Sequence, residues 1–129
     1  MDGFDAALGS KPEVTIPDGR PPKKLVTEDL VVGTGAEAQP TSTVFVHYVG
    51  VAYSTGEEFD TSWDDGAPAR FSLLGVVPGF QRGIAGMKVG GRRRIVIPPH
   101  LGYGDNPRPG GPIGPGETLG FVVDLHAVQ

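Results

Sequence analysis

Residues 76–90 read VVPGFQRGIAGMKVG and contain the one segment of the chain whose spacing predicts a helix. Phe80, Ile84 and Met87 fall at positions i, i+4 and i+7, which is the spacing of one helical face. Gly90 follows and predicts the end of the helix. Gly83 and Gly86, inside the predicted helix, each cost about 1 kcal/mol relative to alanine. We therefore expect packing to hold this helix, and the concave face of a twisted antiparallel sheet is the natural surface for it.

Alternation of apolar and polar residues predicts the strands of that sheet. Val44, Val46 and Tyr48 share one face of a period-two pattern, with His47 on the other face. The pattern is clearest at Leu119, Phe121, Val123 and Leu125, recurs at Ile95 and Ile97, and is weaker in residues 25–32 and 70–73. The chain is thus predicted to be α+β, a twisted antiparallel half-barrel wrapped around one short α-helix, without internal repeats.

Length and composition fit one domain with an attached arm. The chain has 129 residues and no cysteine, and 34 of its residues are glycine or proline. One group of these lies in residues 1–22, which we expect to form a flexible Pro-rich arm before a domain at 23–129. Ten more lie in residues 102–116, between apolar strands. A long connection of this kind inside a compact domain favours a functional loop.

Charge and hydropathy exclude two classes of partner. The net charge of -4 argues against nucleic acid, which requires a basic face. Arginines 92–94 directly precede a strand, so alternation sends neighbours to opposite faces rather than into one patch. The first residues lack the basic and apolar regions of a signal peptide. The chain also has no run of 18 apolar residues, which argues against a helix that crosses a membrane. We expect a cytoplasmic protein, which its lack of cysteine allows.

The sequence predicts no metal and no cofactor. His47, His100 and His126 lie in three separate segments, and no cysteine or carboxylate shares their spacing. Residues 86–91 are rich in glycine but follow the predicted helix. A phosphate-binding loop instead precedes its helix and follows a strand.

Aromatic residues mark the candidate site. Tyr48, Phe59, Phe80, Tyr103 and Phe121 each lie beside a strand, turn or helix signal, and no activated nucleophile accompanies them. Taken in order, the motifs around them closely resemble the FKBP family of prolyl isomerases, which also bind immunosuppressive macrolides. These motifs are Val44–Gly50, Gly56–Asp60, Val76–Phe80 continuing into Gly83–Gly90, Pro99–Gly104 and Gly116–Leu125.

The resemblance covers Lys23 to Val128 and implies a role for each site residue. Phe80, where the family usually has tryptophan, would form the floor on which a proline ring stacks. The walls would be Tyr48, Phe59, Val76, Val77 and Phe121. Tyr103 and the Val77 N–H would donate to ligand carbonyls, Asp60 would lie beside the twisting imide, and Ile113 with its loop would cover the mouth. Tyr48, Asp60, Phe80, Tyr103 and Phe121 would be the catalytic set.

Without the resemblance, each of these residues has a simpler interpretation. A single phenylalanine such as Phe59, Phe80 or Phe121 is more often core packing. Tyr48 and Tyr103 would be tyrosines at a strand end or in a loop with a satisfied hydroxyl. Asp60, which precedes Thr61-Ser62, could cap a turn.

The chain departs from the family pattern at three places. Asp65 stands where an arginine usually holds the aspartate and tyrosine, so Asp60 is expected to lack its cationic partner. Ala69 replaces an aromatic wall residue, and the stretch from Phe71 to Val76 is about two residues shorter. We therefore expect a pocket that is more open on this side.

The function that the resemblance implies is peptidyl-prolyl cis-trans isomerisation during protein folding. Rotation about a peptide bond faces a barrier of about 18 to 20 kcal/mol, and desolvating a prolyl imide in an aromatic pocket lowers it. The expected partners are proline-containing peptides, unfolded chains and macrolides such as tacrolimus and rapamycin, bound by a monomer. The alternative is a non-catalytic or chaperone-like module that only binds prolyl segments.

Overall fold

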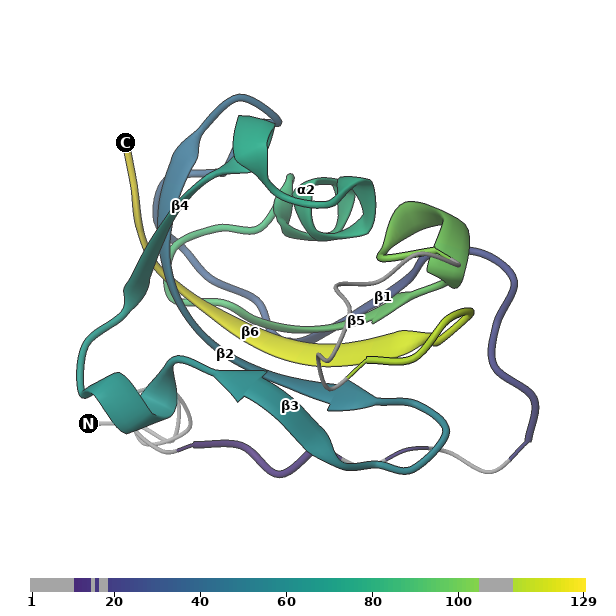
Figure 1. The fold of residues 1–129 in the computed structure, drawn as a ribbon. Helices are drawn as coiled ribbons and strands as arrows, with labels where there is room; N and C mark the ends of the chain where they lie inside the picture. The colour runs from purple at the N-terminus through teal and green to yellow at the C-terminus, as the bar shows by residue number, and fades with distance from the viewer. Residues whose placement is uncertain (1–10, 15, 17–18, 105–112) are drawn as a thin grey trace.

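The centre of the structure is a curved antiparallel sheet. A computed structural model describes residues 11–14, 16, 19–104 and 113–129. Six strands of these residues pair in the order β1-β5-β6-β2-β3, and β4 pairs with the first half of β2 (Figure 1). The strands are β1 Val26–Val31, β2 Thr43–Ala52, β3 Glu58–Thr61, β4 Ala69–Ser72, β5 Arg92–Ile97 and β6 Leu119–Val128. The predicted α+β half-barrel is confirmed.

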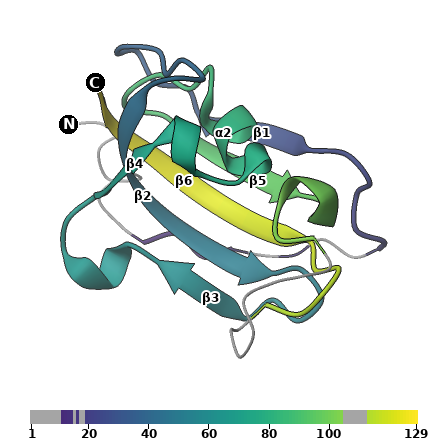
Figure 2. The ribbon, with the colours of Figure 1, turned by 45° about the horizontal axis from the view of Figure 1, so that its top comes forward.

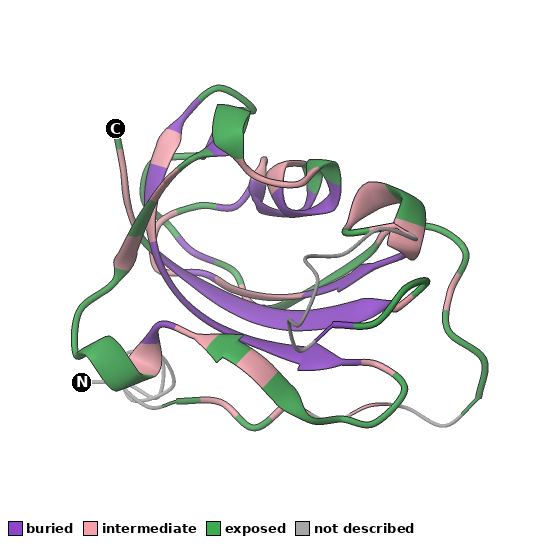
Figure 3. Cartoon of the chain, viewed as in Figure 1, coloured by how far each residue is buried: buried purple, intermediate pink, exposed green. Residues whose placement is uncertain are grey.

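Alternation places the apolar side chains on the concave face, as predicted. Tyr48 of β2 and Phe121 of β6 belong to one buried core cluster, together with Ile95 of β5. β2 and β6 are buried along most of their length because they lie in the middle of the sheet (Figure 3). β1 lies at one edge of the sheet and is mostly exposed. The core therefore fills the space between the two central strands and the helix.

One α-helix, α2 Pro78–Ile84, lies across the concave face (Figures 1 and 2). The predicted helix is confirmed at its start, where Pro78 occupies the first turn, but its predicted extension to Met87 is wrong. The chain leaves the helix at Ala85, whose ψ is 132°, and turns at Gly86, whose positive φ of 91° lies in the left-handed region that favours glycine. Met87 is still buried, because the turn that follows carries its side chain into the core.

Two glycines let α2 approach the sheet closely. A Cβ atom at Gly83 would lie 2.6 Å from Cγ2 of Ile95, and one at Gly79 would collide with Cγ2 of Ile97. The two glycines are four residues apart and so lie on one face of the helix. Glycine lowers the helix propensity at these two positions, but it is needed there because any side chain would overlap the isoleucines of β5.

The arginines of β5 bind on opposite faces of the sheet, as alternation predicts. Arg93 lies on the helix side, where its guanidinium donates to the Gly83 carbonyl at 2.9 Å and pairs with Asp29 at 2.7 Å. Arg92 forms a two-bonded ion pair with the buried Asp124, at 2.6 and 2.8 Å. Arg93 therefore places a cation at the C-terminal end of α2, where the helix dipole favours it.

The described part of the N-terminal arm lies along the sheet on the face away from α2 (Figure 1). Lys11 pairs with Glu58 at 2.9 Å, and a Cβ added to Gly120 would lie 3.5 Å from Cδ1 of the half-buried Ile16. The predicted flexibility of residues 1–22 stays a prediction, since residues 1–10, 15 and 17–18 lie outside the described part. Among the described residues, no helix has the length and apolar character needed to cross a membrane.

Gly83→Ala is expected to lower the free energy of unfolding by about 1 to 3 kcal/mol, because its methyl group overpacks the contact with Ile95. Alanine is the better helix former, so propensity alone predicts the opposite sign. Denaturant unfolding measures the change. Gly75→Ala is the matched control, since a Cβ at Gly75 has no atom within 4 Å. A Gly83→Ala protein as stable as the wild type would contradict the close approach of α2.

Candidate functional site

Five aromatic rings meet between α2 and the sheet and form what we call the aromatic bowl. Phe80 of α2 lies at its centre, with ring centroids 5.2 Å from Phe121, 5.8 Å from Phe71 and 6.1 Å from Tyr48. Phe59 completes the set at 5.7 Å from Phe121. Most pairs are edge-to-face or tilted, which is the arrangement that aromatic quadrupoles favour. The bowl is therefore a packed apolar surface.

Gly50 makes the room that two of these rings occupy. It lies opposite Phe121 in the β2–β6 pairing and opposite Asp60 in the β2–β3 pairing. A Cβ atom at Gly50 would lie 2.6 Å from Cε1 of Phe121 and 2.9 Å from Cζ of Phe59. The glycine of the Val44–Gly50 motif is thus required by the contact between the two rings.

Tyr48 carries the polar group of the bowl. Its side chain is buried, and its hydroxyl donates to Oδ2 of Asp60 at 2.8 Å. Burial raises the pKa of Tyr48 far above its ordinary value, and the hydrogen bond to Asp60 raises it further. The hydroxyl consequently remains protonated, so it donates a hydrogen bond across the physiological pH range.

Asp60 is ordered without the arginine of the family pattern. Asp65 occupies the short 3₁₀ turn η1, Trp63–Asp65, and its charge is close enough to contribute to the raised pKa of Tyr48. The Tyr48 hydroxyl supplies the hydrogen bond to Asp60 instead. This partner lies twelve residues away in the sequence and becomes visible only when β2 and β3 are paired.

The remaining predicted residues differ in how far they are buried. Val76 and Val77 are half-buried between η2, Leu73–Gly75, and α2, and the Val77 carbonyl accepts from the Phe80 N–H. Tyr103, which follows η3, Pro99–Leu101, is 45% exposed, whereas Ile113 is buried in the core cluster. Their roles toward a ligand, including that of the Val77 N–H, stay predictions. Most of the predicted loop over the mouth, residues 105–112, lies outside the described residues.

Phe71 belongs to the bowl but was missing from the predicted set. Its ring lies 5.7 Å from Tyr48 and 5.8 Å from Phe80. The signal was present, because residues 70–73 alternate weakly and their two apolar residues, Phe71 and Leu73, face the core. Ala69, two residues earlier on β4, packs against the same core with only a methyl group.

The outer face of the sheet brings two of the three histidines together. The rings of His47 and His126 lie edge to face at 5.3 Å, and His47 stacks on Trp63 at 4.2 Å. His100 lies apart from them, in η3. Within the described ranges, no group of three histidine, cysteine, aspartate or glutamate residues is placed to hold a metal ion.

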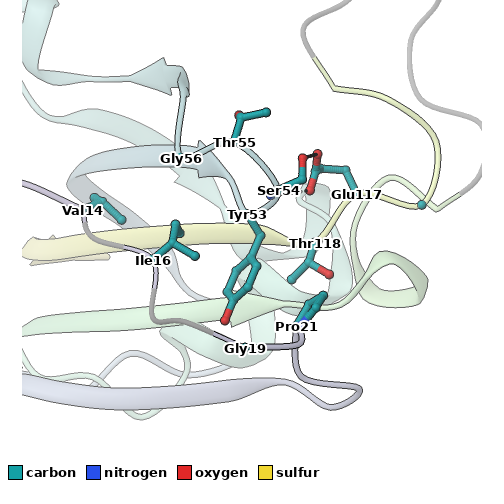
Figure 4. Close-up of a pocket in the computed structure, with 11 residues that line it drawn as sticks. Val14, Ile16, Gly19, Pro21, Tyr53, Ser54, Thr55, Gly56, Glu117 and Thr118 are labelled. Carbon is teal, nitrogen blue, oxygen red and sulfur yellow. Dashed lines mark hydrogen bonds between the residues drawn. The ribbon is translucent and has the colours of Figure 1, made fainter.

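A pocket lies away from the bowl, between the arm and the β2–β3 turn (Figure 4). Its volume is about 520 Å³, and Ile16, Tyr53 and Thr118 are among its lining residues. Glu117 on its wall accepts hydrogen bonds from the Ser54 hydroxyl at 2.6 Å and the Ser54 N–H at 3.1 Å. The pocket contains none of the five rings, so it is separate from the site predicted from the motifs.

Known proteins with similar sequences and folds were identified. A family model described as FKBP-type peptidyl-prolyl cis-trans isomerase matches residues 35–126, more than half of the chain. An FK506-binding protein of Streptomyces anulatus is 57% identical over 120 residues, covering 92% of this chain and 97% of its own. A probable FK506-binding protein of Corynebacterium glutamicum is 52% identical over 115 residues, covering 89% and 96%. The crystal structure of FkpA from Escherichia coli matches with a TM-score of 0.76 and 34% identity, over 98% of this chain and 56% of that one.

Phe80→Ala is expected to lower the free energy of unfolding by about 3 to 5 kcal/mol, because the ring is buried and its loss leaves a cavity between α2 and β6. Thermal or denaturant unfolding measures the change. Leu74→Ala is the control: it removes an apolar side chain that is 69% exposed, and its effect should stay within about 0.5 kcal/mol. Equal stability of the two variants would show that Phe80 is not the floor of a packed bowl.

Proposed function

The chain belongs to the family of FKBP-type peptidyl-prolyl cis-trans isomerases, and we propose that it speeds rotation about X-Pro bonds by taking the prolyl imide out of water in the aromatic bowl. The resemblance read from the motifs is confirmed by these matches. The proposed substrates are proline-containing segments of unfolded or flexible chains. A cytoplasmic location and a monomeric state stay predictions.

Rotation about the prolyl imide requires no nucleophile, only an apolar environment around the bond. Resonance in the planar imide separates charge, and water stabilises that separated charge. In the twisted transition state the resonance is lost, so an apolar surface destabilises the planar ground state more than the transition state. Each tenfold increase in rate needs about 1.4 kcal/mol of this difference. Five packed rings around one protonated tyrosine hydroxyl supply such a surface.

The observation that carries the proposal is the Tyr48–Asp60 pair at the wall of the bowl. The Tyr48 hydroxyl lies among the rings, and its bond to the exposed Asp60 carboxylate connects the apolar surface with solvent. A prolyl ring stacked on Phe80 would place its imide near this polar edge. We propose that Phe80, Tyr48 and Phe121 supply the apolar surface, with Phe59, Val76 and Val77 beside them. Asp60 and Tyr103 are the proposed polar contacts, and Ile113 is proposed to lie near the mouth.

The test is the rate of cis-trans exchange in a tetrapeptide with one X-Pro bond, followed by NMR exchange spectroscopy without a protease. The wild type is expected to raise the exchange rate in proportion to its concentration. Tyr48→Phe keeps the ring and removes the hydroxyl, so it should retain a large share of the activity if desolvation dominates. No acceleration by a folded wild type would overturn the proposal.

A second candidate function is binding of prolyl segments without acceleration. The observation that favours it is that Ala69 contributes only a methyl group to the packing around the bowl, while Asp65 places an anion near Tyr48. The same NMR experiment separates the two functions. A pure binding module would shift the peptide resonances on titration and leave the exchange rate unchanged.

We also propose that the bowl binds macrolides of the tacrolimus and rapamycin type, and Asp65→Arg is expected to tighten this binding by a few-fold at most. The new cation would hold Asp60 for a ligand hydroxyl, and an exposed pair of this kind is worth about 0.2 to 1 kcal/mol. Turnover depends mainly on the rings and should change less. Titration calorimetry measures the affinity.

Asp64→Arg is the control for this experiment. It makes the same change of charge one residue away, but the charge of Asp64 acts on Lys11, whereas that of Asp65 acts on Tyr48. Equal macrolide affinities for the wild type and Asp65→Arg would show that the Tyr48 hydroxyl already orders Asp60 fully.

A further inference from the structure

Ser62 binds the main chain of Tyr48 from the outer side of the bowl. It follows β3 directly and is 1% exposed. Its Oγ accepts from the Tyr48 N–H at 2.7 Å, and its own N–H donates to the Tyr48 carbonyl at 3.1 Å. The Thr61 hydroxyl donates to the same carbonyl at 2.8 Å. Both main-chain groups of Tyr48 are therefore held by residues 61–62.

The Ser62 hydroxyl binds the main chain of Tyr48 and does not cap the turn that follows Ser62. Ser62 is the N-terminal cap residue of η1, where a serine side chain ordinarily accepts from the first N–H groups of the turn, but it makes no such bond. The last residue pair between β2 and β3 is Val49 with Thr61, so the next pair in the ladder would be Tyr48 with Ser62. The Ser62 N–H still donates to the Tyr48 carbonyl, but the Ser62 carbonyl accepts from Asp65, so the Ser62 Oγ takes its place as the acceptor for the Tyr48 N–H.

The second partner of the Ser62 hydroxyl is His47. The Nδ1 atom of His47 lies 2.9 Å from Ser62 Oγ, and His47 is buried on the outer face. Trp63 stacks on its ring, and His126 lies against it edge to face. The β2–β6 register skips His126 between the Phe45–Ala127 and Val46–Leu125 pairs, while Asp124, two residues earlier on β6, pairs with His47.

We propose that Ser62 and a neutral His47 act together as positioning residues for Tyr48. The Ser62 oxygen accepts from the Tyr48 N–H, while its hydroxyl hydrogen goes to Nδ1 of His47, whose own proton lies on Nε2. This chain of bonds fixes the backbone of Tyr48, and through it the ring that packs against Phe80 and Phe121. Protonation of His47 turns Nδ1 into a donor, leaves the Ser62 hydrogen without its acceptor, and loosens Tyr48. The inference rests on the proposed role of the bowl in isomerisation.

The charged groups around His47 give the direction of the pH dependence. Burial lowers the pKa of His47 below its ordinary value of 6.5, and the neighbouring His126 lowers it further. Asp124, which faces His47 across the β2–β6 pairing, acts in the opposite direction, but Arg92 of β5 pairs with it. The unfolded chain therefore takes up this proton first as the pH falls. The ordering of Tyr48 is present above about pH 6.5 and is lost as the pH falls through the lowered pKa.

The test compares kcat/KM for variants of the two residues across this pH range. Ser62→Ala is expected to lower kcat/KM at neutral pH by about tenfold at most, the equivalent of one hydrogen bond. Ser62→Thr keeps the hydroxyl and should restore most of the rate. His47→Gln keeps an acceptor that does not titrate, so it should remove the decline that we expect for the wild type as the pH falls through the lowered pKa of His47.

Ser42→Ala is the matched control. Ser42 is also buried, and its hydroxyl also accepts from a main-chain N–H, that of Gln39 at 2.9 Å, but it lies at the start of β2 away from the bowl. It should lose stability to a similar degree and keep its isomerase rate. Equal rates for Ser62→Ala and Ser42→Ala, or an unchanged pH decline in His47→Gln, would overturn the inference.

A measurement without turnover separates this inference from the proposed function. The ¹⁵N shifts of the His47 ring in the wild type are expected to show an unprotonated Nδ1 and a protonated Nε2 at neutral pH. A proton on Nδ1 would overturn the inference even in an active enzyme. An inactive wild type with the expected tautomer would instead count against the proposed function, and this readout also applies if Ser62→Ala fails to fold.

Discussion

The close approach of α2 to the sheet is the constraint on which the rest of the structure depends. Gly79 and Gly83 present no side chain to β5, so the helix lies directly on Ile97 and Ile95. This contact sets the depth at which Phe80 enters the bowl, and the ring then packs against Phe121. A helix of seven residues with internal glycine has little stability of its own, so packing has to provide it. Helix and bowl therefore form together.

The concave face of β2 is aromatic, whereas its outer face carries buried polar groups. On the concave face Tyr48 joins the rings that exclude water, and its hydroxyl connects them to Asp60. On the outer face the adjacent residue, His47, belongs to a polar layer with Ser62 and Asp124. An apolar surface can change the barrier to rotation only if its walls stay in place. The buried hydrogen bonds of the outer face supply this rigidity without bringing water into the bowl.

The strands and the site motifs could be predicted from the sequence because alternation and motif order are local signals. The end of α2 at Ile84 could not be predicted, because the spacing of Phe80, Ile84 and Met87 continues through the turn in which Gly86 has a positive φ. The partner of Asp60 was missed because it depends on the pairing of β2 with β3. Phe71 was missed although the weak alternation of residues 70–73 indicated it. The contact between His47 and His126 depends on the pairing of β2 with β6, which the period of either strand does not reveal.

The central claim is that the bowl acts by desolvation and not by proton transfer. The solvent deuterium isotope effect on kcat/KM for prolyl exchange tests it most directly, because a proton moving in the transition state slows the reaction in D₂O. The account predicts the same rate in H₂O and D₂O within experimental error, for the wild type and for Tyr48→Phe. A rate about twofold or more lower in D₂O, lost in Tyr48→Phe, would show that the Tyr48 hydroxyl transfers a proton, and would contradict the account.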